Sequence, residues 1–252
     1  MAKPMIYALD FDGVICDSAV ETGMTGWKAG SKIWDDMAGS APVELIDMFR
    51  QVRPVIETGY EAILAMRLLH QGETVDDIYG NFADKAASLM TSAGVSVDDL
   101  KQLFGDTRDH WIATDLGDWI AMNPLYPGVA ERLSVLSRNA HQQPWYIVTT
   151  KQERFVKQIL AANVIDIEES AIFGLDRNMN KVSVLSALQN DHPDQAIYFI
   201  EDRLPTLINV AKTPQLDRVK LVFALWGYNT DEDKRTALAH RFAAQKLDNF
   251  LE

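Results

Sequence analysis

The sequence of 252 residues predicts an α/β protein with a doubly wound parallel sheet, interrupted by an all-helical insertion. The main observation is that, from residue 124 onward, short apolar segments alternate with amphipathic helical patterns. A further apolar segment, Met5 to Leu9, is followed instead by a long stretch with helical periodicity and no convincing strand. We therefore expect a discontinuous core of residues 1–16 and 124–252, and a helical domain of residues 17–123.

The first predicted strand, Met5 to Leu9, ends abruptly in two aspartates, Asp10 and Asp12. The carboxyl end of a strand is where an open α/β sheet places its ligand crevice. Two carboxylates at such a place repel each other unless a cation lies between them. Oxygen ligands suit a hard cation, and Mg²⁺ is typically held by one or two carboxylates together with substrate phosphate.

The insertion has several apolar patterns of helical period and no internal repeat. They cover Val43 to Val52 after Pro42, Ile63 to Leu69 before Gly72, Ile78 to Leu89, and a segment that opens at Asp98. Arg53 to Tyr60 is predicted to be a loop or helix break, and Arg53 could bind an anionic group there. A surface ion pair is the plainer interpretation of Arg53.

The second half of the chain predicts the rest of a Rossmann-like core. Strands are expected at Trp145 to Thr149, Ala171 to Leu175, Ala196 to Ile200 and Val219 to Leu225. Helices are expected at Val129 to Leu136, Phe155 to Ala162, Val182 to Leu188, Leu204 to Ala211 and from about Asp231. Met5 to Leu9 would supply the first and central strand.

Polar residues follow three of these strands. Thr149 stands at the end of an apolar strand, and Thr150 is the alternative for the same position. A helix is expected to start soon after, and a helix start favours anions. Lys181 stands at the start of a helix and is the expected cation of the site. Lys151 and Arg177 are the alternatives for this role. Glu201 and Asp202 end another apolar strand as adjacent acids, which in isolation would also suit a helix N-terminus.

Together these segments resemble the four motifs of the haloacid dehalogenase superfamily, and the helical insertion resembles its type-one cap in length and position. The resemblance implies that Asp10 is a nucleophile that forms an aspartyl-phosphate and that Asp12 is the general acid and base. It implies that Thr149 binds the phosphoryl group and that Lys181 neutralises it. Mg²⁺ would be held by Asp10, the main-chain carbonyl of Asp12, Asp202 and, directly or through water, Glu201.

The chain departs from the family pattern at two positions. Val182 stands where a proline usually follows the lysine, and Thr206 stands where a third acid is common after the strand-end pair. Two further segments, Trp226 to Tyr228 and Tyr126 to Val129, resemble phosphoglycolate-phosphatase-like members.

The resemblance implies a Mg²⁺-dependent phosphatase that acts on a small phosphorylated metabolite. Alternatives within the superfamily are a phosphomutase, a phosphonatase with a cap lysine such as Lys28 or Lys32, and a dehalogenase. A dehalogenase would need neither Asp12 nor the acidic pair. A non-catalytic binding protein on the same fold is a further alternative, although such a protein would more readily lose Asp10, Asp12 or Lys181.

The bulk properties restrict the partners and the compartment. A formal net charge of −12 disfavours nucleic acid and anionic membranes. The only cysteine, Cys16, permits no internal disulfide, which fits a reducing compartment. The start Met-Ala-Lys-Pro lacks the apolar region of a signal peptide, and no apolar run is long enough to span a bilayer. We expect a soluble cytoplasmic protein.

Overall fold

A computed structural model describes residues 5–251 of the chain, so Met1 to Pro4, which bear on the signal-peptide prediction, lie outside it. The chain divides into two compact units. The first joins Asp17 and the residues before it to the chain from Pro124 onward, and the second is Ser18–Asn123. Asp17, which the sequence analysis assigned to the insertion, thus groups with the first unit.

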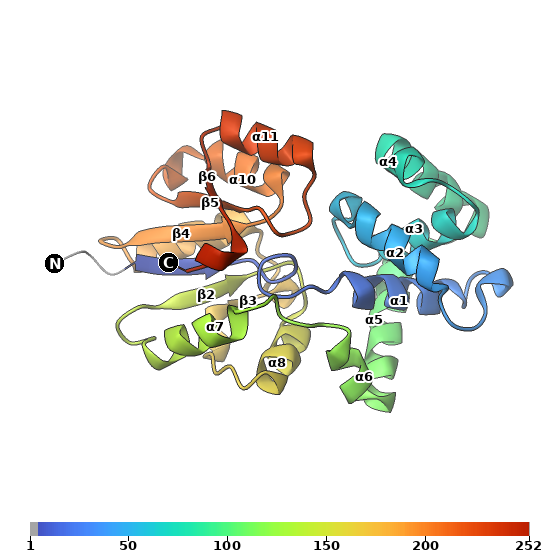
Figure 1. Cartoon of the computed structure of the whole chain (residues 1–252), viewed down its shortest axis with the longest axis horizontal. Coiled ribbons are helices and arrows are strands. Elements are labelled where there is room, and N and C mark those ends of the chain that lie inside the picture. Colours follow the sequence, from blue (N-terminus) through green and yellow to red (C-terminus); the bar gives the residue numbers. More distant parts are fainter. Residues whose placement is uncertain (1–4, 252) are drawn as a thin grey trace. The chain divides into compact units, whose positions relative to one another are not determined.

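The first unit is built on one parallel sheet of six strands in the order β3-β2-β1-β4-β5-β6 (Figure 1). The strands are β1 (Met5–Leu9), β2 (Trp145–Val148), β3 (Ile172–Phe173), β4 (Ala196–Glu201), β5 (Lys220–Ala224) and β6 (Ala243–Gln245). The prediction that the first strand is central is confirmed, since β1 pairs with β2 on one side and with β4 on the other.

Helices cover both faces of this sheet, as a doubly wound fold requires. They are α7 (Val129–Arg138), α8 (Glu153–Ala162), α9 (Lys181–Asp191), α10 (Leu204–Ala211) and α11 (Asp231–Ala239). Successive β1 side chains point to opposite faces, yet Ile6, Tyr7, Ala8 and Leu9 are all buried. One of these faces packs Ile6 and Ala8 against α9 and α10. The predicted fold class is therefore confirmed.

Two strands differ from the prediction. The strand expected at Ala171 to Leu175 is only β3, because the chain turns away at Gly174, whose N–H donates to the Glu153 carboxylate. A side chain at Gly174 would lie 2.6 Å from Glu153 Cγ, so the backbone approaches α8 closely there. The strand β6 was not predicted, because its three residues, two of them exposed, lack an apolar pattern.

The second unit is all-helical over the described residues. Its helices are α1 (Ala19–Gly30), α2 (Val43–Val52), α3 (Glu61–His70), α4 (Val75–Ala93), α5 (Val97–Thr114) and α6 (Leu116–Ala121). The sequence analysis missed α1, whose three glycines disfavour a helix in isolation. The structure gives the reason for one of them. A side chain at Gly26 would lie 2.6 Å from the Ala62 carbonyl oxygen, so glycine lets α1 approach α3 closely.

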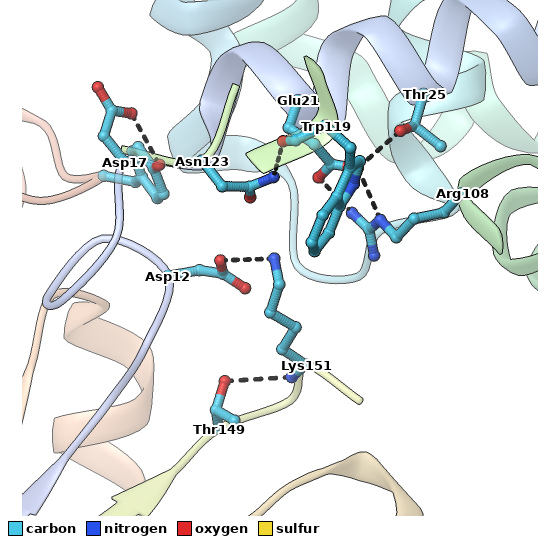
Figure 2. Close-up of polar contacts among 10 residues, drawn as sticks. Asp12, Asp17, Glu21, Thr25, Arg108, Trp119, Asn123, Thr149 and Lys151 are labelled. Carbon is cyan, nitrogen blue, oxygen red and sulfur yellow. Dashed lines mark hydrogen bonds and ion pairs between the residues drawn. The ribbon is translucent and has the colours of Figure 1, made fainter. Parts of the chain in front are cut away.

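A buried polar cluster joins α1 to α5 and α6 within the second unit (Figure 2). The Glu21 carboxylate is fully buried and accepts two hydrogen bonds from Arg108, at 2.7 and 2.6 Å. It also accepts hydrogen bonds from the Thr25 hydroxyl and the Trp119 indole. Since the buried charges are paired and hydrogen-bonded, this cluster fixes one packing arrangement of the three helices.

No helix in residues 5–251 combines the length and the apolar character that crossing a lipid bilayer requires.

One strained residue in the first unit leads to a stability prediction. Val164 follows α8 with a φ of 57° and is 88% exposed. A β-branched residue is disfavoured in this left-handed region, which glycine adopts readily. We expect Val164→Gly to raise the free energy of unfolding by roughly 1 kcal/mol, measured by thermal denaturation.

The matched control is Val135→Gly, because Val135 is 48% exposed in the middle of α7. Glycine there should lower the free energy of unfolding by about 0.5–1 kcal/mol. Equal effects of the two substitutions would contradict the strain at Val164.

Candidate active site

The site begins at the carboxyl end of β1, where the chain leaves the sheet in a tight turn. Asp10 directly follows β1, its N–H donates to the Ile200 carbonyl at 2.9 Å, and its side chain is buried. The N–H groups of Ile15 and Cys16 both donate to the Phe11 carbonyl, which closes the turn. Gly13 lies within it at a φ of 92°, a conformation that glycine adopts without strain. The turn holds the residues after Asp10 against the end of the sheet.

Two more acids stand beside Asp10 because β4 is the neighbour of β1. Leu9 pairs with Ile200, so the residues that follow, Asp10 and Glu201, are adjacent across the two strands. Glu201 and Asp202 are fully buried. Each of the three acids offers one oxygen, and these oxygens lie within 4.8 Å of one another. The acidic cluster, defined as Asp10, Glu201 and Asp202, could hold a metal ion.

Lys181 supplies the positive charge that faces this cluster. It is the first residue of α9, whose preceding Asn180 side chain accepts from the Ser183 N–H and so caps the helix. Its Nζ lies 2.9 Å from Asp10 Oδ1 and 2.6 Å from Glu201 Oε2. Burial lowers the pKa of Lys181, but the two carboxylates outweigh burial and raise this pKa above its ordinary value.

The acidic cluster carries more negative charge than Lys181 offsets. Burial, followed by the charge of Glu201, raises the pKa of Asp10 from 3.8 to about 7, against the opposing effect of Lys181. Lys181 contacts two of the three carboxylates, and its single positive charge offsets only one of their three negative charges at full ionisation. A divalent cation would balance that surplus.

A second ion pair lies beside the first, from the loop after β2. Thr149 follows β2 and is buried, whereas Thr150 is exposed. The Thr149 hydroxyl accepts from the Lys151 N–H at 3.1 Å. Lys151 Nζ in turn lies 2.9 Å from Asp12 Oδ1, with only 2% of its side chain exposed (Figure 2). Lys151 therefore contacts Asp12, while Lys181 contacts Asp10.

Two arginines that the sequence analysis considered for the site, Arg177 and Arg53, bond to groups outside the acidic cluster. Arg177, considered as a substitute for Lys181, donates to the Glu153 carboxylate at 2.7 Å and to the Glu169 carbonyl. Arg53 belongs to the second unit, where its guanidinium donates to the Ile56 carbonyl at 2.9 Å. The structure thus brings Lys181 rather than Arg177 to Asp10, and it does not test the predicted role of Arg53.

Sequence reasoning missed the pairing of Lys151 with Asp12, although a signal was present. Neighbouring parallel strands end at the same edge of the sheet, so residues three positions beyond each strand can meet. Asp12 and Lys151 occupy comparable positions after β1 and β2, which pair directly.

No protein-family model matches the sequence, and no curated protein matches it either. Solved structures do match. A predicted phosphatase from Clostridium acetobutylicum is 18% identical, with a TM-score of 0.61, over 99% of this chain and 97% of that one. A predicted phosphoglycolate phosphatase from Haemophilus somnus is 15% identical, with a TM-score of 0.61, over 100% and 97%.

A further match is a haloacid dehalogenase (HAD) family hydrolase from Deinococcus radiodurans, solved with bound phosphate and sodium. It is 13% identical, with a TM-score of 0.51, over 97% of this chain and 90% of that one. The chain therefore has the fold of the haloacid dehalogenase-like hydrolases, and two of the matches reported above are named as predicted phosphatases. At such low sequence identity this likeness shows the fold alone.

Proposed function

We propose that the chain is a Mg²⁺-dependent phosphatase that hydrolyses a small phosphorylated metabolite through an aspartyl-phosphate on Asp10. The observation that carries the proposal is the acidic cluster with Lys181 bonded to two of its members. A carboxylate nucleophile needs a cation to bring a phosphate group near it, and this arrangement offers both a metal site and an ammonium group. The phosphate bound to the Deinococcus hydrolase of the same fold agrees with it.

The cluster suits Mg²⁺ in its chemistry. Its donors are carboxylate oxygens, and its surplus of negative charge matches a divalent ion. Asp10, Asp202 and the main-chain carbonyl of Asp12 would hold the ion. Both Glu201 oxygens accept hydrogen bonds, from Lys181 and from the Arg203 N–H, so Glu201 orients Lys181 and reaches the ion directly or through water. When bound, the ion would offset charge on the nucleophile and on the phosphate.

The side chains divide the reaction into two displacements. In the first, an Asp10 oxygen attacks phosphorus, the bond from phosphorus to the ester oxygen breaks, and the Asp12 carboxyl protonates that departing oxygen. In the second, Asp12 takes a proton from water, the water oxygen attacks phosphorus, and Asp10 leaves as a carboxylate. Lys181 and Thr149 hold the phosphoryl oxygens throughout, which is the positioning and charge stabilisation that phosphoryl transfer requires.

The helical unit, residues 18–123, is proposed as the cap domain that supplies substrate specificity, with Arg53 as a residue that binds an anionic leaving group. This step depends on analogy with proteins of the same fold. It implies small substrates, with no part for nucleic acid or membrane.

The test is a panel of phosphate esters assayed with Mg²⁺ and with EDTA, together with a phosphonate, a 2-haloacid and a sugar phosphate isomer. We expect inorganic phosphate to be released from one or more esters only when Mg²⁺ is present. Metal-independent turnover, or preferential release of halide, would contradict the proposed mechanism.

Lys151 provides a separate prediction about the general acid and base. Its buried ammonium holds Asp12 through a 2.9 Å ion pair, so Lys151→Met removes this ion pair and should misplace the Asp12 carboxyl group. We expect kcat to fall by about 100-fold, since a general acid or base contributes at least that much. The measurement is steady-state kinetics at saturating Mg²⁺ on the best ester of the panel.

The matched control is Lys157→Met. Lys157 also forms a 2.9 Å ion pair, with Glu169, but its side chain is 35% exposed on α8. Loss of such a pair should change kcat little. A kcat within about twofold of the wild type for Lys151→Met would mean that Asp12 needs no help from Lys151.

A further inference from the structure

The loop between β5 and α11 contacts the site on two sides. Asn229 lies in this loop, and its side-chain amide donates to the main-chain carbonyls of Asp202 and Ala224, at 3.2 and 2.9 Å. The loop is thereby tied to the ends of both β4 and β5. We call residues 226–229, Trp226 to Asn229, the anchor loop.

The anchor loop also binds the carboxylate of Asp202. The Tyr228 N–H donates to Asp202 Oδ2 at 2.6 Å, a short hydrogen bond to a fully buried acid. A main-chain donor has no rotamers of its own, so it fixes the direction of the carboxylate more firmly than a flexible side chain would. Asp202 therefore depends on the backbone position of Tyr228.

Glycine is required where the loop meets Asp202. A side chain at Gly227 would place its Cβ less than 3.0 Å from Asp202 and from the Gly13 carbonyl oxygen. A side chain at Gly13 would likewise approach Asp202 to less than 3.0 Å. The Asp202 side chain is thus enclosed by two glycine backbones, one from the turn after β1 and one from the anchor loop.

The same loop holds the turn after β1. The Trp226 indole N–H donates to the Val14 carbonyl at 3.1 Å, and the Tyr228 hydroxyl donates to the Asp17 carboxylate at 3.0 Å. That turn carries Asp12 and begins at Asp10. A single short loop is therefore bonded to both segments that supply the acids of the site.

From these contacts we propose that the anchor loop is the positioning element of the metal site, with Gly227 and the Tyr228 N–H setting the orientation of Asp202. The inference rests on the proposed function and extends it to residues that touch neither substrate nor metal. Groups that orient metal ligands commonly change metal affinity by about 10–100-fold when altered. A loop with a merely structural role would change stability without this loss.

The experiment measures Mg²⁺ affinity directly, by isothermal titration of the whole metal-free protein. Gly227→Ala should weaken Mg²⁺ binding by at least about 10-fold, because the added methyl group displaces Asp202 or the loop. Gly105→Ala is the matched control, since a Cβ at Gly105 in α5 meets no atom within 4 Å. The control should keep the wild-type affinity, and circular dichroism with EDTA should show that each variant is folded.

Asn229→Ala is the second variant, used whether or not Gly227→Ala folds. It removes the two side-chain hydrogen bonds that tie Asn229 to the ends of β4 and β5 without adding volume, and it should also weaken Mg²⁺ binding. Wild-type affinity in a folded Gly227→Ala protein, or in Asn229→Ala if the first variant is unfolded, would overturn this inference but not the proposed function. Failure of the wild-type protein to bind Mg²⁺ would instead overturn the proposed function.

Discussion

Replacing Asp10 with asparagine should lower kcat by at least about 10⁴-fold while leaving the protein folded. An amide has nearly the size and shape of a carboxylate, but its oxygen carries no charge and its nitrogen has no lone pair suited to attack phosphorus. Lys181 keeps its 2.6 Å contact with Glu201 in the variant, so the site should not collapse. Steady-state release of inorganic phosphate measures the effect.

A covalent trap makes this prediction specific to the nucleophile. Wild-type protein quenched in acid during turnover should carry one phosphoryl group on the peptide that contains Asp10, detected by mass spectrometry, and Asp10→Asn should carry none. Asp217→Asn is the matched control, because Asp217 is an exposed aspartate of the same unit. Activity of Asp10→Asn within about tenfold of the wild type would rule out Asp10 as the nucleophile.

The sheet and the meeting of the acids follow from simple patterns in the sequence. Apolar strands alternating with helices predicted the parallel sheet, and a parallel sheet brings its carboxyl ends to one edge. Acids directly after β1 and β4 were therefore expected to be close, and the register of Leu9 with Ile200 places Asp10 next to Glu201. This expectation required only that β1 is the central strand, and the complete strand order did not have to be known.

The partners of the lysines could not be predicted in the same way. Lys151 and Lys181 each follow a loop whose path depends on local backbone geometry, such as the left-handed Asn178 before α9. The sequence therefore left Lys181, Lys151 and Arg177 as alternatives for one role. In the structure the two lysines contact different aspartates, and Arg177 pairs with Glu153.

Close backbone approaches were also invisible in the sequence. The glycines of α1 disfavour a helix in isolation, although the lack of a side chain at Gly26 is what allows α1 to contact α3 closely. In the sequence, Gly227 was only part of a segment that resembles other family members and was given no catalytic role. In the structure, its lack of a side chain leaves room for Asp202. In both cases the residue is explained by a partner far away in the chain, and no local pattern identifies that partner.

Removing the metal should make stability depend strongly on pH. In the metal-free protein the pKa of Asp10 is about 7, against an ordinary value of 3.8, because burial and Glu201 disfavour its charge. Between these values the folded state keeps a proton that the unfolded chain has lost, so stability falls as pH rises through this window. The full shift corresponds to roughly 4 kcal/mol. Metal-free protein should thus unfold at a lower temperature at about pH 8 than at about pH 5.

Mg²⁺ should offset most of this dependence, because the ion binds the ionised form of Asp10 and competes with its proton. At a concentration near 100 times its dissociation constant, Mg²⁺ adds about 2.7 kcal/mol, which is about 5–10 °C in Tm for a chain of this size. Thermal unfolding at both pH values, with EDTA and with Mg²⁺, measures the effect. The Asp10→Asn variant is the control, since it cannot ionise there and should lose most of the dependence on both pH and metal. An equal Mg²⁺-induced rise in Tm in the two proteins would show that the ion binds elsewhere than the acidic cluster.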